Sequence, residues 1–475
     1  MMLILMLACT GKKTTPSGDT APAADTDTPG ETGTPDDTGT PDSGVEVVWD
    51  EADFLHVYDI GPGHAYETPD DLPWESLEPS TLVRIHHRDA PYAAKWVIST
   101  AATQEAPLVV LGIDGPVITG EDASTRPELD YWNEDRSVIK IGDSSSSSET
   151  PAWVHLQGLT IQSGHPDYTF TDDAGSPGTY TDNAACVFVE TGSHVTIRDS
   201  VLTDCGNGLF VSSAATDVLI AQNYIYGNGI VDDYYEHNTY TEALGIIYEY
   251  NRFGPLRDGA TGNNLKDRSA GTVIRYNWIE GGNRQLDLVD SGSTTLLSDP
   301  SYAITEVYGN VLIEPDDAGN SQVIHYGGDS GDESQYRGGI LLLHHNTIVS
   351  QRTGNTTLVR LSSVGESADI RNNVVVTGGS LAILAESGNA ELTDNLLPTD
   401  WRDSFEGSLD GTVTDGGNLE GGADLDAEHR PSSGSAAVGA AGASHPDAEA
   451  VTMEYALHQS GAARDAVDLG AFSAP

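Results

Sequence analysis

Positive charge is scarce in this 475-residue chain, and much of it is concentrated in one short stretch. Residues 262 to 291 carry Lys266, Arg268, Arg275 and Arg284, although the whole chain has only 22 Lys and Arg against 73 Asp and Glu. Lysine and arginine bind and neutralise anions, and a neutral lysine can also accept a proton. The stretch is therefore either a basic structural turn or a place where the protein handles an anionic group.

A second group of titratable residues lies just before this stretch, in the sequence YYEHNTYTEA. It contains His237, Tyr240 and Glu242, and Asp287 and Asp290 follow the cations. Histidine, tyrosine and carboxylates can exchange protons with a substrate, and carboxylates can also bind a cation. Each residue also has a structural explanation, as a hydrogen-bonded side chain or a turn cap. Only a fold that brings these segments together makes them a site.

A short repeated pattern predicts such a fold. From Val154 onward, an apolar doublet is followed by a marker residue, usually asparagine, at intervals of roughly 22 to 41 residues, which is typical of solenoids. Short period-two strands separated by Gly, Asn and Asp turns predict an all-β chain that forms a single-stranded right-handed parallel β-helix. We expect the markers to stack in the same turn of successive coils; they are Leu159, Ser200, Asn223, Asn251, Asn277, Asn310, Asn346, Asn373 and Asn395.

Alignment of the repeats on these markers predicts which side chains share a face. A second strand follows each marker, and its alternation places Leu265 and Leu288 inside. We expect Lys266 on the outer face, with His237 and Tyr240 one coil below it and Asp287 one coil above it. The other outward candidates for binding a linear polymer are Asn264, Arg268, His325 or Tyr326, and Arg360.

The sequence NNLKDRSAGTVIRYNWIEGGNRQLDLVDS resembles the core of polysaccharide lyase family six, the alginate lyase and chondroitinase B group, and more loosely other β-helix lyases of the pectate lyase superfamily. In that family a lysine is the general base and an arginine one coil later assists at the leaving oxygen. Lys266 and Arg284 match those positions. The resemblance implies Ca²⁺ as a cofactor, but Gly259 and Thr261 stand where its carboxylates are expected. The remaining candidate ligands are Glu242, Asp287 and Asp290.

The resemblance implies that the chain cleaves a uronate-containing polysaccharide by β-elimination. This reaction needs a neutralised carboxylate, a base for the C5 proton and an acid for the departing O4. Arg268 or Ca²⁺ would neutralise the carboxylate, and Lys266 would be the base, with His237 as its rival. Tyr240 or Arg284 would assist the departure of O4.

The overall charge limits the possible partners. A formal charge of −51 and a pI of about 4.2 disfavour nucleic acid and anionic membrane surfaces as partners. The same charge opposes an acidic polysaccharide, so local cations or divalent ions must overcome it. Two alternatives therefore stay open: a glycoside hydrolase that uses Asp287 with Asp290 or Glu242 on a weakly charged glycan, and a noncatalytic glycan-binding adhesin.

The two ends of the chain differ in composition from the repeats. Residues 1 to 9 resemble a lipoprotein signal in which Cys9 is lipidated, which predicts an exported chain with a lipid anchor as its sole membrane contact. We expect a disordered linker over residues 10 to 45, the β-helix over 46 to 410, and C-terminal coils with a closing strand over 411 to 475. The chain is expected to be a monomer. Cys186 and Cys205 form either one disulfide or two buried thiols.

Overall fold

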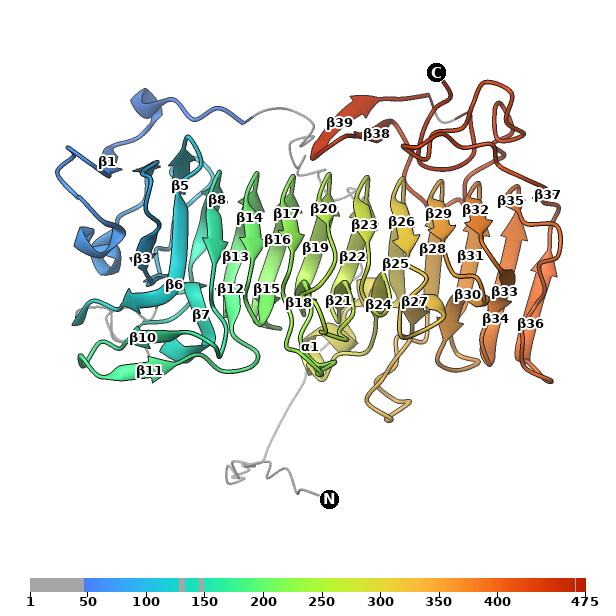
Figure 1. Cartoon of the computed structure of the whole chain (residues 1–475), viewed down its shortest axis with the longest axis horizontal. Coiled ribbons are helices and arrows are strands. Elements are labelled where there is room, and N and C mark those ends of the chain that lie inside the picture. The colour runs from blue at the N-terminus through green and yellow to red at the C-terminus, as the bar shows by residue number, and fades with distance from the viewer. Residues whose placement is uncertain (1–46, 128–132, 145–148, 466) are drawn as a thin grey trace, which may run out of the picture. The chain divides into compact units, whose positions relative to one another are not determined.

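A computed structural model of the protein describes residues 47 to 127, 133 to 144, 149 to 465 and 467 to 475. The predicted signal with Cys9 and the whole of the predicted linker lie outside these residues. Within them the chain forms a right-handed parallel β-helix, as the repeats predicted, in which each coil contributes strands to three parallel ladders (Figure 1).

The first ladder carries the residues of most interest for function. Its strands are β4 (Trp96–Ile98), β7 (Ser137–Ile141), β12 (Ala185–Val189), β15 (Asn207–Val211), β18 (Thr239–Thr241), β21 (Leu265–Asp267), β24 (Leu286–Leu288), β27 (Gln322–Tyr326), β30 (Asn355–Leu361) and β33 (Ser380–Leu384).

The second ladder follows the first in each coil and extends further at both ends. Its strands are β1 (His56–Ile60), β2 (Thr81–His86), β5 (Leu108–Ile113), β8 (Ala152–Gln157), β13 (Gly192–Arg198), β16 (Ala215–Ala221), β19 (Leu244–Glu249), β22 (Ala270–Arg275), β25 (Ile304–Tyr308), β28 (Ile340–His344), β31 (Ser367–Arg371), β34 (Ser387–Thr393) and β36 (Asp410–Asp415).

The third ladder completes each coil. Its strands are β3 (Tyr92–Ala94), β6 (Val117–Ser124), β9 (Thr160–Gln162), β14 (Val201–Thr203), β17 (Tyr224–Tyr226), β20 (Arg252–Phe253), β23 (Trp278–Glu280), β26 (Val311–Glu314), β29 (Thr347–Ser350), β32 (Val374–Thr377), β35 (Leu396–Leu397) and β37 (Leu419–Glu420). Near the N-terminal end, β10 (Thr169–Thr171) and β11 (Pro177–Thr179) extend this ladder sideways from β6.

The marker asparagines stack in the bend between the second and third ladders, which confirms the interpretation of the repeats. The amide of Asn277 donates to the side-chain oxygen of Asn310 at 2.9 Å, and Asn310 donates to Asn346 at 3.0 Å. The same bond links every successive marker from Asn223 to Asn395 and continues to Asn418. Buried amides that are fully paired in this way fix the bend of each coil.

The interior of the β-helix is a continuous apolar core contributed by all three ladders. Cys186 and Cys205 are both buried in it and form a disulfide, with their Cα atoms 5.6 Å apart. Of the two alternatives, one disulfide or two buried thiols, the structure contains the disulfide. It joins the first ladder to the turn after β14 and closes one coil on itself.

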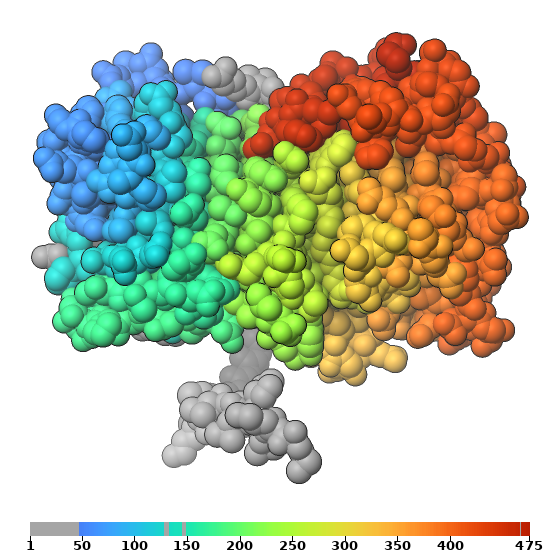
Figure 2. Space-filling view, viewed as in Figure 1, coloured from blue at the N-terminus to red at the C-terminus, as the bar shows by residue number. Residues whose placement is uncertain are grey.

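After β37 the chain does not add further coils. Residues 421 to 475 run back along the helix and include a small hairpin, β38 (Met453–Ala456) and β39 (Ser460–Ala463) (Figures 1 and 2). The segment contacts distant coils, since Gln459 exchanges two hydrogen bonds with Gln222 and Glu449 pairs with Arg275 at 3.1 Å. The expected closing strand is instead a turn whose Leu469 and Phe472 are buried. These apolar side chains pack better against the outside of the third ladder than at a solvent-exposed end.

No helix in the described residues is long and apolar enough to cross a membrane.

Candidate functional site

One row of side chains runs along the outer face of the first ladder. The strand register pairs Phe210 with Tyr240, Tyr240 with Lys266, and Lys266 with Asp287 on successive coils. The row continues through His325 and Arg360. Neighbouring strands lie about 4.8 Å apart, so successive members of the row are direct neighbours. The β-helix therefore brings together residues that are widely separated in sequence.

Lys266 lies at the centre of this row and is held by two carboxylates. Its Nζ donates to Asp287 and, at 2.7 Å, to Asp329. The Lys266 side chain is only 7% exposed. Its ammonium is therefore enclosed by protein, and the exchangeable contact is the one with Asp329, whose side chain is a third exposed.

Asp287 is the fixed member of this pair. It also accepts from Asn263 Nδ2 at 2.8 Å and from His325 Nδ1 at 2.8 Å. Burial raises its pKa, but the charge of Lys266 and the His325 hydrogen bond outweigh burial and hold it well below the usual range. His325 in turn contacts Ser362 Oγ through Nε2 at 2.9 Å, which fixes the ring. Asp287 is an ionised anchor for Lys266 and has no oxygen free to act as an acid or base.

Arg268 extends the cationic centre by one residue beyond β21. Its Nε donates to the Tyr240 hydroxyl at 2.8 Å, its NH2 donates to Asp329 at 2.8 and 3.1 Å, and its NH1 donates to the backbone oxygen of Asp290. Burial lowers the pKa of Arg268, but Tyr240 and Asp329 outweigh it and raise that pKa. Arg268 is therefore a permanent cation that holds both a hydroxyl and a carboxylate.

The bend after β21 explains why Arg268 points outward. The buried Asp267 carboxylate accepts from Thr272 Oγ1 at 2.6 Å and from the Ser269 amide at 3.1 Å. It also pairs with the fully buried Arg337 at 3.3 Å. A buried carboxylate that is satisfied on both oxygens makes a rigid turn. Arg268 is positioned by this turn rather than by a flexible loop.

Asp329 is the residue that sequence reasoning missed. It lies in the loop after β27 and bridges the two cations, accepting from Lys266 and from Arg268. Burial raises the pKa of Asp329, but the charges of Lys266 and Arg268 outweigh burial and lower that pKa below its usual value. The carboxylate is therefore ionised. Its own amide donates to Asp290 Oδ1 at 2.7 Å, which holds the loop over the row. The only sequence signal was its glycine-rich setting, GGDSGDE, which has no strand periodicity.

A surface hollow opens beside this cluster. Tyr240, Glu242 and Arg268 line it, with Ser213 and residues 292 to 294 completing a volume of about 550 Å³. The Glu242 carboxylate accepts a hydrogen bond from Ser291 Oγ. Because the Tyr240 and Arg268 side chains reach both the hollow and the charged cluster, a ligand that enters the hollow contacts them first.

Arg284 and His237 flank the row. Arg284 donates to Gln322 Oε1 at 2.8 Å and lies 3.9 Å from Asp287, so it shares that carboxylate with Lys266. His237 is buried, accepts the Asn263 amide at 2.9 Å and stacks near the Tyr240 ring. Burial and the charge of Lys266 lower the pKa of His237 to about 3, so the ring is neutral. It supports Tyr240 and Asn263 from behind and does not face the hollow.

Two candidates from the sequence lie away from this surface. Tyr326 belongs to the apolar core, and its neighbour His325 is the outward residue. Asn264 is fully buried and accepts the side-chain amide of Asn238 at 2.8 Å, in a second stack of asparagines. Both residues are placed to support the coil, and neither can reach a polymer on the outer face. Arg360 remains partly exposed at the far end of the row.

The predicted calcium ligands do not form a common site. Asp287 is used by Lys266, His325 and Asn263, and Asp290 Oδ1 accepts two backbone amides of the Asp329 loop. In the part of the chain that the structure describes, the group of three His, Cys, Asp or Glu donors within 4.8 Å of one another is Asp59, His64 and His86, at the N-terminal end. Calcium prefers six to eight oxygen ligands, which the predicted trio does not provide.

The chain matches no family model and no curated protein. It is similar to the solved structure of pectate lyase Pel9A, with 11% identity, coverage of 89% of this chain and 97% of that chain, and a TM-score of 0.47. An alginate lyase from Paenibacillus sp. str. FPU-7 gives 10% identity, 73% and 94% coverage, and a TM-score of 0.43. A GH136 lacto-N-biosidase from Eubacterium ramulus has 11% identity, with coverage of 77% of this chain and 67% of that chain, and a TM-score of 0.37. At these TM-scores the fold and site of this chain rest on its own strand register and side chains.

Proposed function

We propose that this chain is an exported polysaccharide lyase that cleaves a uronate-containing polymer by β-elimination. The observation that carries the proposal is the bridging of Lys266 and Arg268 by one carboxylate, that of Asp329, at the edge of an open hollow. A pair of cations that holds a carboxylate from the protein itself can hold the carboxylate of a uronate in the same place.

Substrate binding would replace one carboxylate by another. Asp329 comes from a loop and is partly exposed, whereas Lys266 and Arg268 are fixed by the strand and by the turn at Asp267. A uronate entering the hollow would displace Asp329 and take both cations. Neutralising its carboxylate makes the C5 proton acidic, which is the first requirement of β-elimination.

The geometry changes the roles expected from the sequence. Lys266 remains bonded to Asp287 even when Asp329 leaves, so it serves best as a cation rather than as the base. Tyr240 borders the hollow, and its oxygen accepts the Arg268 Nε–H, which fixes that oxygen beside the two cations. We assign Tyr240 as the base that takes the C5 proton.

The reaction balances with Tyr240 alone. Its phenolate oxygen takes the proton from C5, the electron pair of that C–H bond forms the C4=C5 double bond, and the C4–O4 bond breaks. Tyr240 then returns the proton to the departing O4, which restores the phenolate. No oxidant, water or other co-reactant is consumed. The proposal needs no metal for these steps.

The row also suggests the direction in which the polymer lies. On one side of Tyr240, Phe210 is stacked with it at a centroid distance of 5.0 Å and offers an apolar platform for a sugar ring. On the other side, Arg284 and Arg360 supply positive charge. A linear acidic polymer would therefore run along the helix axis, one coil after another. Export and a lipid anchor at Cys9 belong to the same proposal, and intact-mass measurement of the mature chain tests them.

A screen of alginate, pectate and glycosaminoglycans tests the proposed activity. A lyase leaves an unsaturated ring that absorbs in the ultraviolet, with or without a chelator. A hydrolase would give new reducing ends without that absorbance, and a binding module would retain polymer without releasing product. The engagement of both Asp287 oxygens by Lys266, Asn263 and His325 argues against a hydrolase that uses this carboxylate as its acid or base.

A further inference from the structure

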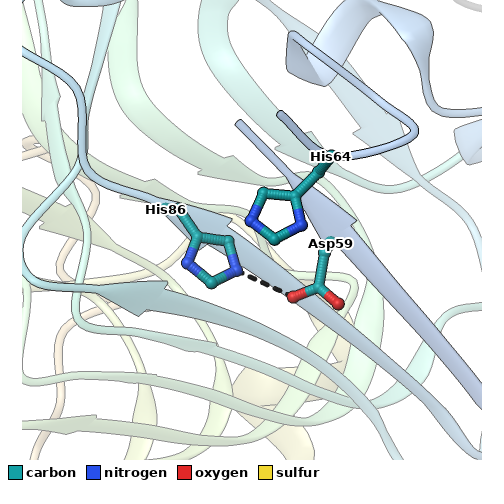
Figure 3. A group of neighbouring side chains, drawn as sticks. All are labelled: Asp59, His64 and His86. Atoms are coloured by element: carbon teal, nitrogen blue, oxygen red, sulfur yellow. Dashed lines mark hydrogen bonds and ion pairs between the residues drawn. The ribbon is translucent and has the colours of Figure 1, made fainter. Parts of the chain in front are cut away.

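A cluster of two histidines and one aspartate lies at the N-terminal end of the β-helix, several coils from Lys266 (Figures 1 and 3). Asp59 is on β1, His86 is on the neighbouring β2, and His64 is on the turn that follows β1. His86 Nε2 lies 2.7 Å from Asp59 Oδ1, and the His64 ring stacks over His86 at 4.3 Å. One donor atom from each residue lies within 4.8 Å of the other two.

Asp59 is held in place by a paired arginine. Arg84 is its strand partner in the register and donates to both carboxylate oxygens at 2.8 Å. Burial raises the pKa of Asp59, but the hydrogen bonds from Arg84 and His86 outweigh it and lower that pKa. Arg84 is also paired with Glu51 at 2.7 Å. The two carboxylates outweigh the single guanidinium charge, so the surroundings of the cluster stay favourable for a cation.

His64 is held over this pair by a hydrogen-bonded turn. The Gly61 amide donates to the Tyr66 carbonyl at 2.8 Å, and the His64 amide donates to the Gly61 carbonyl at 3.1 Å. His64 is exposed, whereas Asp59 and His86 are half-buried. The open side of the cluster faces solvent, which leaves room for water ligands.

We propose that Asp59, His64 and His86 bind one divalent transition-metal ion of the zinc class, which fastens the turn around His64 to the first coils. Two imidazole nitrogens and one carboxylate oxygen, with water in the remaining position, suit Zn²⁺, Ni²⁺ or Cu²⁺. Calcium and magnesium prefer oxygen ligands and are not expected to bind. The ion takes the place of the proton shared between His86 and Asp59, and Arg84 stays behind Asp59 as the group that orients it.

Calorimetric titration of the chelator-treated full chain with ZnCl₂ tests the site directly. We expect one ion per chain and a higher melting temperature in Zn²⁺, with no response to CaCl₂. His64→Ala should weaken Zn²⁺ binding at least tenfold. It removes an exposed side chain, and circular dichroism should show intact folding. His86→Gln keeps a group that can bond Asp59 and should lose binding as well.

His87→Ala is the matched control, because His87 is the next residue along the chain, is exposed and contacts the Gly115 carbonyl instead of the cluster. It should bind Zn²⁺ like the wild type. The proposal is overturned if the wild type shows neither binding nor a thermal shift. Equal binding by wild type, His64→Ala and His86→Gln would place the ion elsewhere and would overturn it too. These readouts do not depend on the proposed lyase activity.

Discussion

Replacing Asp329 by asparagine should make the protein bind an acidic polysaccharide more tightly. Asp329 occupies the position that the proposed substrate carboxylate needs, between Lys266 and Arg268. Asparagine has a similar size and keeps one oxygen acceptor, but it carries no charge. The variant therefore leaves the two cations in place and weakens only the group that competes with the substrate.

The size of the effect follows from the contacts that the substitution weakens. Asp329 accepts from Lys266 at 2.7 Å and from Arg268 at 2.8 and 3.1 Å. Hydrogen bonds to charged groups contribute about 1.5 to 3 kcal/mol. The Asp329 side chain is a third exposed, so solvent reduces each cation's contribution to roughly 1 kcal/mol. Asparagine should lose about 1 to 2 kcal/mol in total, which corresponds to roughly a five- to thirtyfold lower KM or Kd.

The measurement is the Kd for a uronate oligomer by calorimetry, together with KM by ultraviolet absorbance. Glu333→Gln is the control, because Glu333 lies in the same loop and is exposed. The substitution removes the same charge at a residue that contacts neither cation. Unchanged or weaker binding by Asp329→Asn, beside an unchanged control, would show that Asp329 supports the substrate rather than competing with it. Equal tightening in both variants would instead indicate a general charge effect.

Three further outcomes are expected. Tyr240→Phe should lower kcat at least about a hundredfold while the ring stays stacked; ultraviolet assays beside Tyr224→Phe, on another ladder, check this, and near wild-type turnover would contradict it. Burial raises the pKa of Glu236 to about 7, so the contribution of Glu236 to the free energy of unfolding falls as pH rises from about 4.5 to 7. Glu236→Gln should therefore raise the melting temperature at pH 8 but not at pH 4.5, and an equal effect at both would refute this. Replacing Cys186 and Cys205 by alanine should cost about 3 kcal/mol, and an unchanged denaturant midpoint would refute a stabilising disulfide.

The repeat and its register could be predicted from sequence because they depend on local patterns. Asparagine at the bend and two-residue alternation in the strands fix the coil, so these patterns placed Lys266 one coil above His237 and Tyr240 and one coil below Asp287. The strand register of the structure then identifies Tyr240 as the direct partner of Lys266. The same alternation failed to choose between His325 and Tyr326, because both are buried, His325 on the outer face and Tyr326 in the core. Hydrophobic pattern separates the two faces only when one of them meets water.

Asp329 could not be predicted, because its partner residues lie more than sixty positions away and its loop has no periodicity. A loop of this kind is placed by a few specific hydrogen bonds, such as that from the Asp329 amide to Asp290. The base was also assigned differently from sequence alone. The sequence around Lys266 suggested a base, but in the structure two carboxylates, those of Asp287 and Asp329, surround this lysine. Such spatial neighbours cannot be deduced from the residues next to it in the sequence.

The proposed exchange of carboxylates would explain how so acidic a chain binds an acidic polymer. Lys266 and Arg268 are largely buried, and buried cations without counterions are strongly unfavourable, so the resting site must contain its own anion. When a uronate replaces Asp329, the buried charges stay balanced and Asp329 moves towards solvent. The remaining repulsion comes from distant surface carboxylates, which salt screens over about 8 to 10 Å. The cluster of scarce cations is thus best understood as a neutral resting site whose anion the substrate can replace.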